Sequence, residues 1–376
     1  MNQHLIAEYV SPGHPDRLAD AIVERLVDFA VARDADALVG LECAVHTNHV
    51  FVDGRIAAGR SRKDVVTDDD VRAAVRETYR AAGYDATWSP APDELTILTN
   101  VCYEDLGNEE RGIRDLSDDQ NVVVGYACKR PETDYLPPAH FVANYIGRAL
   151  WAWRQTASDK FGPDFKVLVD LSEEGGHLVW NRLTLNVQHK SGVFATEQHA
   201  RVMPVVRETL EKLEARGVRG VADLPQERVV LNGLGDFILG GPEGDNGLSG
   251  KKLVVDFYGP GVPIGGGAIC GKDPHKVDVA GAFRARELAL KLVKERGDAA
   301  VMVRLGWTPG DAAPAFREAV GIDSLGLAHP IPAAALPPEE WFSIHSIVAD
   351  LKLTQFNRAS RVLSGYFFSS SEVGWK

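Results

Sequence analysis

Apolar residues recur at helical spacing directly after Pro15, with charged residues between them. A repeat of three to four residues places such side chains on one buried face of a helix. The apolar positions are Leu18, Ile22, Leu26 and Phe29. The same spacing predicts further helices over residues 68–79, with Thr67 as N-cap, and over residues 139–156, 197–216, 278–296 and 340–353.

Extended runs of apolar and β-branched residues lie between these helices. Residues 38–47 and 50–58 are joined by the polar pair Asn48-His49 and predict a β-hairpin. Further strands are expected over residues 94–102, 122–128, 166–171, 177–189, 228–231, 237–239 and 299–307. Because hairpins occur among the helices, we predict layered α+β units rather than one doubly wound sheet.

Two changes of pattern suggest where the units divide. Residues 103–121 are polar and almost free of periodicity, and a glycine-rich stretch begins near residue 240. A long polar loop inside a compact chain is usually functional. We therefore expect an N-terminal domain over residues 1–105, a central domain over 106–234 and a C-terminal domain over 235–376.

The charge balance restricts the partners. The chain has 376 residues and a formal net charge of -12 at pH 7, whereas nucleic-acid binding needs a basic surface. No stretch approaches the roughly 20 apolar residues of a membrane span, and the four cysteines form no CxxC pair. We therefore expect a cytoplasmic protein with reduced thiols that contacts neither nucleic acid nor membrane.

The turn over residues 11–17 runs directly into the first helix. Free backbone N–H groups and the helix dipole make a helix start attractive to phosphate. His14 is placed to donate to a phosphate oxygen, and Asp16 to hold a divalent cation. Taken alone, these residues also fit an ordinary helix start with Pro15 in its first turn.

Two glycine-rich segments carry lysines beside aspartates. Residues 240–252 end in two lysines, and residues 265–278 interleave Lys272 and Lys276 with aspartates. Glycine lets the backbone approach a ligand closely, and alternating cations and carboxylates suit a polyphosphate bound with Mg²⁺. A solvated loop with surface lysines is the alternative interpretation of the first segment.

Residues 266–272 also fit the G-x-x-x-x-G-K pattern of a P-loop. That motif needs Ser or Thr at the next position to reach Mg²⁺, and a helix that follows at once. Here Asp273 and Pro274 follow. We therefore reject a P-loop.

Together, the three segments resemble the signature motifs of the methionine adenosyltransferase (S-adenosylmethionine synthetase) family. Residues 13–20 read GHPDRLAD, against the family form GHPDK-[IL]-xD. Residues 240–252 resemble GGPxGDxGLTGRK, and residues 265–278 resemble GGGAFSGKDPxKVD. The matches occur in the family's order, and the resemblance extends from the start of the chain to about residue 295.

The resemblance implies an α+β fold of three similar α/β sandwich domains with pseudo-threefold symmetry. It implies that the sulfur of methionine attacks the 5′ carbon of ATP and expels triphosphate, which is hydrolysed to pyrophosphate and phosphate. A thioether is neutral and needs no general base, so the chemistry centres on stabilising the leaving group. It also implies a homodimer with active sites shared between subunits, alone or as a dimer of dimers.

The resemblance also assigns site residues. Mg²⁺ is expected at Asp16 and Asp278, and K⁺ at Glu42. The residues expected at the reacting groups are His14, Lys166, Lys252 and Lys272. Those expected to bind ATP or its phosphates are Arg17, Asp119, Phe237, Lys251, Gly266 and Gly267. Those expected to border the acceptor are Arg55, Glu104, Asp245 and Lys276.

Four of these positions depart from the family pattern. Arg17 replaces a lysine and Lys251 an arginine, and both changes keep the positive charge. Arg55 stands where the family has a glutamate that meets the methionine ammonium, and Glu104 aligns with a glutamine that meets the carboxylate. Because a reversed charge would repel the ammonium, Arg55 and Glu104 either pair with each other or serve a different acceptor.

Three functions are compatible with these observations. The first is S-adenosylmethionine synthesis from ATP and methionine, and the second is the same ATP chemistry on a different nucleophile. The third is a non-catalytic ATP-binding subunit. Retention of Asp16, Lys272 and Asp278 argues against the third, because binding alone does not need the full leaving-group apparatus.

Overall fold

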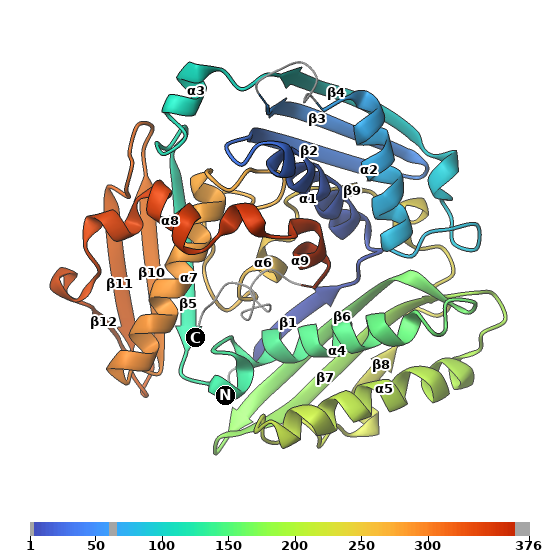
Figure 1. Ribbon diagram of the computed structural model, residues 1–376. Helices are drawn as coiled ribbons and strands as arrows, with labels where there is room; N and C mark the ends of the chain where they lie inside the picture. Colours follow the sequence, from blue (N-terminus) through green and yellow to red (C-terminus); the bar gives the residue numbers. More distant parts are fainter. Residues whose placement is uncertain (1–3, 60–65, 365–376) are drawn as a thin grey trace.

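The computed structural model describes residues 4–59 and 66–364, and their strands form three four-stranded sheets (Figure 1). The first sheet has the order β4-β3-β2-β9. Its strands are β2 (Leu38–His46), β3 (His49–Ala57), β4 (Thr96–Glu104) and β9 (Gly247–Leu248). Antiparallel pairing of β2 with β3 confirms the predicted hairpin.

The other two sheets have the same size. The second has the order β1-β6-β7-β8, with β1 (Leu5–Val10), β6 (Phe161–Glu174), β7 (His177–His189) and β8 (Val229–Leu231). The third has the order β12-β11-β10-β5, with β5 (Asn121–Cys128), β10 (Ala300–Trp307), β11 (Phe316–Ile322) and β12 (Ala328–Pro330).

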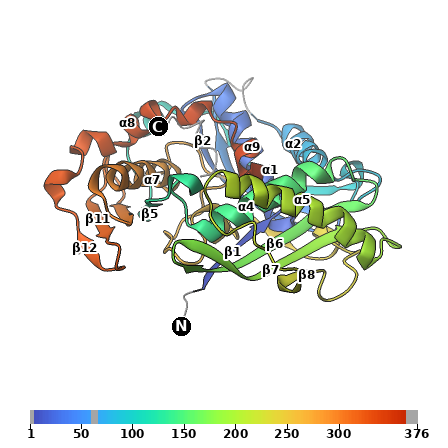
Figure 2. The same cartoon turned by 90° about the horizontal axis from the view of Figure 1, so that it is seen from below.

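Helices cover one face of each sheet. The first sheet carries α1 (Pro15–Arg33) and α2 (Asp68–Ala81), the second α4 (Pro138–Arg154) and α5 (Ala195–Ala215), and the third α7 (Val277–Arg296) and α8 (Ile344–Asp350). Figure 2 shows α4 and α5 on one side of the second sheet. Short helices α3 (Asn108–Gly112), α6 (Leu253–Asp256) and α9 (Arg358–Ser364) lie in the connections. Three similar α/β units were expected, and this arrangement confirms them.

The capping residues explain where the main helices begin and end. His14 is the N-cap of α1, with Pro15 as its first residue. Thr67 caps α2, and Asp70 completes a capping box, as the acidic first turn predicted. Helix α7 ends at Gly297, whose φ of 87° suits glycine.

The strand pairing crosses both expected domain boundaries. β1 pairs with β6, β5 pairs with β10, and β9 pairs with β2. Each sheet therefore takes strands from two of the segments 1–105, 106–234 and 235–376. The division of the chain into three domains with these boundaries stays a prediction. Residues 365–376 of the last segment lie outside the described residues.

Two predicted elements were wrong. Residues 237–239 form no strand: Phe237 accepts a hydrogen bond from the Nα–H of His189, but Gly235, with a φ of 103°, turns the chain just before it. The helix expected over residues 340–353 is reduced to α8, preceded by the 3₁₀ turn Glu339–Phe342. Pro337 and Pro338 disfavour helix directly before that turn. Strands β1, β9, β11 and β12 and helices α3, α6 and α9 were not predicted.

Over residues 4–59 and 66–364, every helix is too short or too polar to cross a lipid bilayer.

Candidate functional site

The turn before α1 is fixed against strand β6. The hydroxyl of Ser11 donates to the carbonyl of Pro163, and its backbone N–H donates to the carbonyl of Phe165. A Cβ on Gly13 would lie 2.5 Å from Pro163, so glycine is needed for this contact. The packing brings β6, which carries Lys166, beside the start of α1.

His14 is held as a neutral hydrogen-bond donor. Its side chain is 1% exposed, and Nδ1 accepts the backbone N–H of Asp16 at 3.2 Å. Burial, reinforced by the positive charges of Lys166 and Lys252, lowers the pKa of His14 to about 3. The proton of the neutral ring is therefore on Nε2, which has no hydrogen-bond partner among the described residues.

Asp16 is the centre of a cluster at the start of α1. Lys252 donates to its Oδ2 at 2.6 Å, and the Leu248 N–H donates to its Oδ1 at 3.0 Å. Lys251 Nζ lies 3.2 Å from Oδ1. Burial opposes ionisation of Asp16, but the bonds from Lys252 and Leu248 outweigh it and lower the pKa of the carboxyl. Asp16 is therefore a carboxylate held between cations.

Asp164 belongs to the same cluster and was not predicted. It is buried, its Oδ2 accepts the N–H of Gly241 at 2.8 Å, and its Oδ1 has no partner in the described part of the chain. Burial raises the pKa of Asp164 to about 6. The signal in the sequence was the alternation of Asp164 with Lys166 along one strand, which places both near the same end of the sheet.

Phe237 and Asp245 lie at the rim of this cluster. The N–H of Phe237 donates to His189 Nε2 at 3.1 Å at the end of β7. Asp245 is exposed, accepts the N–H of Asn246 and interacts electrostatically with Asp164. We call the set formed by His14, Asp16, Asp164, Lys166, Lys251 and Lys252 the α1 cluster.

A second cluster forms at the start of α7. Lys272 donates to Asp278 Oδ1 at 2.5 Å. Gly267 lies against this carboxylate, since a Cβ there would be 1.7 Å from Asp278 Oδ1. Gly266, by contrast, has open space at its Cβ position. We call the set Gly266, Gly267, Lys272, Lys276 and Asp278 the α7 cluster.

Lys276 and Asp119 were both expected at the rim of the site. Lys276 forms an ion pair with Asp118, the neighbour of Asp119. Asp119 is exposed, and its carboxylate accepts the N–H of Gln120 at 2.7 Å. The sequence therefore located the loop but not which of its two aspartates contacts the lysine.

Strand β2 connects the two clusters. Gly40 forms an isolated bridge with Lys272, and Ala44 pairs with Leu248, whose N–H binds Asp16. Four residues of strand separate Gly40 from Ala44, or about 13 Å. Between them, Glu42 is exposed and accepts a hydrogen bond from the hydroxyl of Ser249 at 2.5 Å. Within one chain, β2 therefore contacts the two clusters at positions four residues apart.

Arg55 and Glu104 do pair with each other. Arg55 is in register with Gly40, at the Lys272 end of the sheet. Its guanidinium donates from Nε to Glu104 Oε2 at 2.9 Å, and Nη2 lies 2.8 Å from Glu110 Oε1. Glu110, on helix α3, was not predicted. The cluster of one arginine and two glutamates carries a net charge of -1.

Arg17 does not point toward the phosphate-binding residues, contrary to the expectation. Its side chain is 4% exposed and forms ion pairs with Asp256 at 2.5 Å and Asp20 at 3.4 Å. The reason is that Arg17 lies on the buried side of the first turn of α1, next to α6. Asp256 and Asp20 therefore compensate the positive charge of Arg17.

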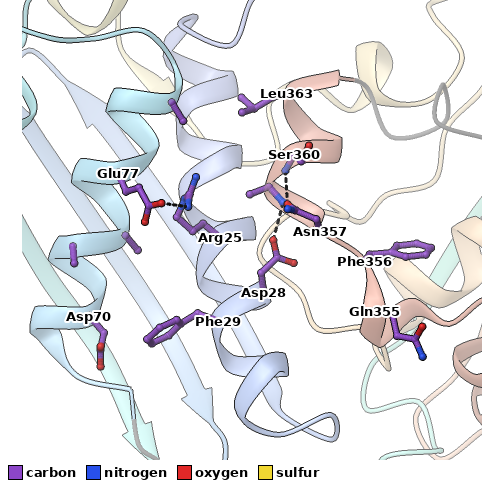
Figure 3. A pocket seen from close by; sticks show the side chains of 14 residues that line it. Arg25, Asp28, Phe29, Asp70, Glu77, Gln355, Phe356, Asn357, Ser360 and Leu363 are labelled. Atoms are coloured by element: carbon purple, nitrogen blue, oxygen red, sulfur yellow. Dashed lines mark hydrogen bonds and ion pairs between the residues drawn. The ribbon is translucent and has the colours of Figure 1, made fainter. Parts of the chain in front are cut away.

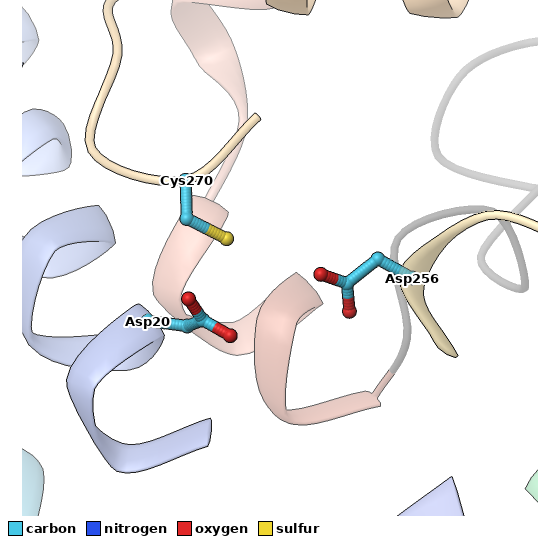
Figure 4. Close-up of side chains that lie close together, drawn as sticks. All are labelled: Asp20, Asp256 and Cys270. Carbon is cyan, nitrogen blue, oxygen red and sulfur yellow. The ribbon is translucent and has the colours of Figure 1, made fainter. Parts of the chain in front are cut away.

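Asp20, Asp256 and Cys270 face one another beside Arg17 (Figure 4). Their ligand atoms lie within 4.8 Å of each other, and Arg17 supplies a positive charge at this place. Burial and the neighbouring Asp256 raise the pKa of Asp20 to about 8. Protonation of Asp20 and the positive charge of Arg17 therefore account for this pair of carboxyls without a metal ion.

A cavity of about 690 Å³ lies elsewhere, between α1, α2 and the segment that ends in α9 (Figure 3). Its walls include Arg25, which pairs with Glu77, and Asp28. None of the predicted site residues lines it. Since the α1 and α7 clusters contribute none of its walls, this cavity is not the candidate site.

Known proteins are similar to this chain in sequence and in fold. The family model of the S-adenosylmethionine synthetase N-terminal domain matches residues 2–102, and that of the S-adenosylmethionine synthetase C-terminal domain matches residues 239–375. An S-adenosylmethionine synthase of Hyphomonas neptunium is 33% identical over 317 residues, which cover 82% of this chain and 78% of that protein. The chain belongs to the S-adenosylmethionine synthetase family.

Further relatives agree with this assignment. An S-adenosylmethionine synthase of Zymomonas mobilis is 32% identical over 322 residues, covering 83% of this chain and 79% of that protein. The structure described as an unusual S-adenosylmethionine synthetase from Campylobacter jejuni superimposes with a TM-score of 0.82 at 22% identity, over 99% of this chain and 96% of that one. This likeness and the C-terminal match to residues 239–375 both include the part of the chain after residue 295, where the resemblance in the sequence motifs ended.

Proposed function

We propose that this S-adenosylmethionine synthetase family member transfers the adenosyl group of ATP to the sulfur of methionine, producing S-adenosylmethionine, pyrophosphate and phosphate. The observation that supports it best is the pair of lysine–aspartate contacts, Lys252 with Asp16 and Lys272 with Asp278. Both pairs present a cation beside a carboxylate at the start of a helix. A triphosphate leaving group needs such charges.

In the reaction, the methionine sulfur forms a bond to the 5′ carbon of ATP as the bond from that carbon to oxygen breaks. The electron pair leaves with the triphosphate. Lys166, Lys252 and Lys272 bind the developing charge, and Lys251 adds to it. Neutral His14 donates from Nε2 to the departing oxygen side, because its other nitrogen is engaged by Asp16. Phe237 stacks near adenine, and Gly266, Gly267 and Asp119 border the nucleotide.

The donor groups present suit the expected cations. Asp16 and Asp278 offer carboxylate oxygens, the ligands that Mg²⁺ prefers together with phosphate. Glu42 offers an exposed carboxylate between the clusters, and K⁺ would be held there. Mg²⁺ bound at the aspartates supplies positive charge to the triphosphate. The lysines that pair with these aspartates would then turn to the phosphates.

The acceptor pocket suits methionine better than Arg55 alone suggested. Because Glu104 and Glu110 neutralise Arg55 and leave a net negative charge, the corner attracts an ammonium group. Lys276 belongs to the α7 cluster at this end of the sheet and would border the acceptor, whereas Asp245 lies at the rim of the α1 cluster and would reach the acceptor only in a site shared between subunits. This arrangement removes the reason for invoking a different nucleophile.

The face of the first sheet that carries Glu42 also carries a row of exposed apolar residues. Leu248, Ala44, Phe51 and Leu98 are in register across four strands. The exposed fractions of Phe51, Leu98 and Leu248 are 42%, 53% and 46%. Such a row beside Glu42 supports a homodimer in which the α1 cluster of one subunit meets the α7 cluster of the other. Dimers that pair further remain compatible with this.

The cytoplasm is the compartment that we propose. The four cysteines are free thiols, and three of them are buried, which suits a reducing environment.

The direct test is mass spectrometry of the products formed from ATP, Mg²⁺ and K⁺ with methionine and with a panel of other thioethers and amino acids. The proposal expects S-adenosylmethionine, and a KM for methionine in the micromolar to low millimolar range usual for enzymes. Turnover of another thioether, without turnover of methionine, would mean that the acceptor is that thioether and not methionine. Absence of any adenosyl product would leave only an ATP-binding role.

A further inference from the structure

A buried arginine connects the last described helix to the segment that carries Lys272. Arg358 is the first residue of α9, and its side chain is 1% exposed. Its backbone N–H and that of Ala359 donate to the two carboxylate oxygens of Asp28 on α1, at 2.9 and 3.0 Å. Figure 3 shows Asp28 between the two helices. These bonds fix the start of α9 on α1.

From this anchor, the guanidinium reaches into the core. Its Nε lies 2.7 Å from Glu24 Oε2, and Nη2 lies 3.1 Å from Glu24 Oε1. The same Nη2 donates to the carbonyls of Ile269 at 3.2 Å and Lys272 at 3.0 Å. Glu24 Oε1 also accepts the N–H of Gly271 at 2.7 Å. One buried ion pair therefore binds the backbone of three residues within 269–272.

This backbone has no helix or strand of its own to hold it in place. Gly271 has a φ of 80°, and the segment contacts β2 through Leu41 and the bridge from Gly40 to Lys272. The opposite side of the segment is held by Arg358 and Glu24. With its carbonyl fixed there, Lys272 directs its ammonium to Asp278.

We propose that Arg358 is a positioning residue that sets the place of Lys272 for adenosyl transfer. This inference rests on the proposed function for its kinetic consequence. Arg358 does not touch the reacting groups, and it acts through the carbonyls of Ile269 and Lys272. It gives the part of the chain after residue 300, where the sequence motifs end, a role in the site.

Three variants and a matched control separate positioning from general stability. R358K keeps a positive charge for Glu24, but a lysine cannot span the carboxylate and two carbonyls with one planar group. E24Q/R358M removes both charges, so no unpaired ion stays buried. R361M is the control, because Arg361 is also 1% exposed on α9 and stacks over Phe356. R358M alone is the third variant, and it leaves the carboxylate of Glu24 buried without the cation of Arg358.

Steady-state kinetics with ATP and methionine give the first readout. A displaced Lys272 weakens contacts made in the transition state, so we expect kcat to fall about tenfold to a hundredfold in R358K and E24Q/R358M. The KM for ATP should change less than about threefold. R361M should keep kcat within about twofold at temperatures where it is folded. Equal kcat losses in R358K and R361M would overturn the proposal.

Hydrogen–deuterium exchange of the peptide around residues 265–276 gives a second readout that does not need activity. Exchange at Gly271 should speed up in R358K and E24Q/R358M and stay unchanged in R361M. If wild-type protein makes no S-adenosylmethionine, the proposed function fails while this exchange result still decides the positioning. Unchanged exchange in every variant would contradict it.

Discussion

At the scale of single residues, burial and hydrogen bonds together set the charge states of the groups in the candidate site. His14 is neutral because it is buried near two lysines, and Asp16 is ionised because hydrogen bonds outweigh its burial. Lys272 takes its place beside Asp278 from the backbone around it. For the proposed function, His14 is thus ready to donate to a phosphate oxygen, Asp16 to bind Mg²⁺ and Lys272 to contact the triphosphate.

Lys272 is the most exposed of these three groups, and Lys272→Met tests its role. Loss of a cation that stabilises the leaving triphosphate should lower kcat by about 10²-fold or more, while the fold survives. The measurement is steady-state S-adenosylmethionine formation. Lys291→Met, on the exposed side of α7, is the control and should keep kcat near wild type. A K272M enzyme with wild-type kcat would show that Lys272 does not stabilise the leaving group.

The Asp20–Asp256 pair predicts a pH dependence of stability. The pKa of Asp20 is raised to about 8 in the folded chain, above its value of about 4 when unfolded. Its stabilising contribution is therefore complete below pH 4 and is lost as pH rises through 8. Asp20→Asn cannot ionise, so the drop in thermal midpoint between pH 5 and 9 should be smaller than in wild type.

The control for this pH series is Asp159→Asn, because Asp159 is exposed. It should follow the wild-type curve at every pH. A D20N curve parallel to wild type would show that Asp20 is not the group that titrates.

The sequence predicted most residues of both clusters but not their partners. Asp16, Lys252, Lys272 and Asp278 lie in contiguous motifs, which a single chain reveals. Asp118 and Glu110 became visible only with the fold, because their loop has no periodicity. Arg17 was misplaced for a related reason: a motif does not tell which side of a helix's first turn faces the core.

At the scale of elements, glycines decide how closely the loops approach the helix starts. Gly247 is packed so tightly on the start of α1 that a Cβ would lie 2.2 Å from the Pro15 backbone. Gly267 is packed instead on a side chain, the carboxylate of Asp278. The glycine-rich motifs thus serve packing between elements as well as ligand approach.

Gly267→Ala and Gly266→Ala make a matched pair. The first adds a methyl group 1.7 Å from Asp278 Oδ1, and the second adds it to open space. Overpacking of this kind costs about 1–3 kcal/mol, so G267A should have a lower thermal midpoint than wild type, and G266A should not. Equal midpoints for the two variants would mean that the loop moves freely away from Asp278.

Helices and hairpins with strong periodicity were predictable, and short edge elements were not. α1, α2 and the β2–β3 hairpin have clear apolar spacing and caps. β12 and β9 are three and two residues long, so their sequence holds too little pattern. β9 depends on β2, which is far away in the chain, and β12 depends on the neighbouring strand β11.

At the scale of the whole molecule, the distance between the clusters is the main constraint. About 13 Å of strand separates Gly40 and Ala44, the two positions of β2 that contact the clusters, and the exposed apolar row lies on the same sheet face. A second subunit over this row would hide the apolar side chains and complete both sites. No pattern in one sequence reveals such a surface, because it depends on strand register.

Phe51→Glu tests the shared site. A charge in the middle of the row should convert the dimer to a monomer in light scattering and abolish S-adenosylmethionine synthesis. Leu325→Glu is the control, since Leu325 is 82% exposed between β11 and β12 and far from the row in sequence. It should leave both mass and activity unchanged. An active monomeric F51E would contradict a shared site.

The central claim is cleavage of ATP at its 5′ carbon by methionine sulfur. Phosphorus NMR of one reaction, combined with mass spectrometry of the same sample, tests it most directly. The account predicts S-adenosylmethionine, pyrophosphate and phosphate in equal amounts, with no ADP or AMP. Formation of ADP or AMP, without an adenosyl–sulfur product, would contradict it.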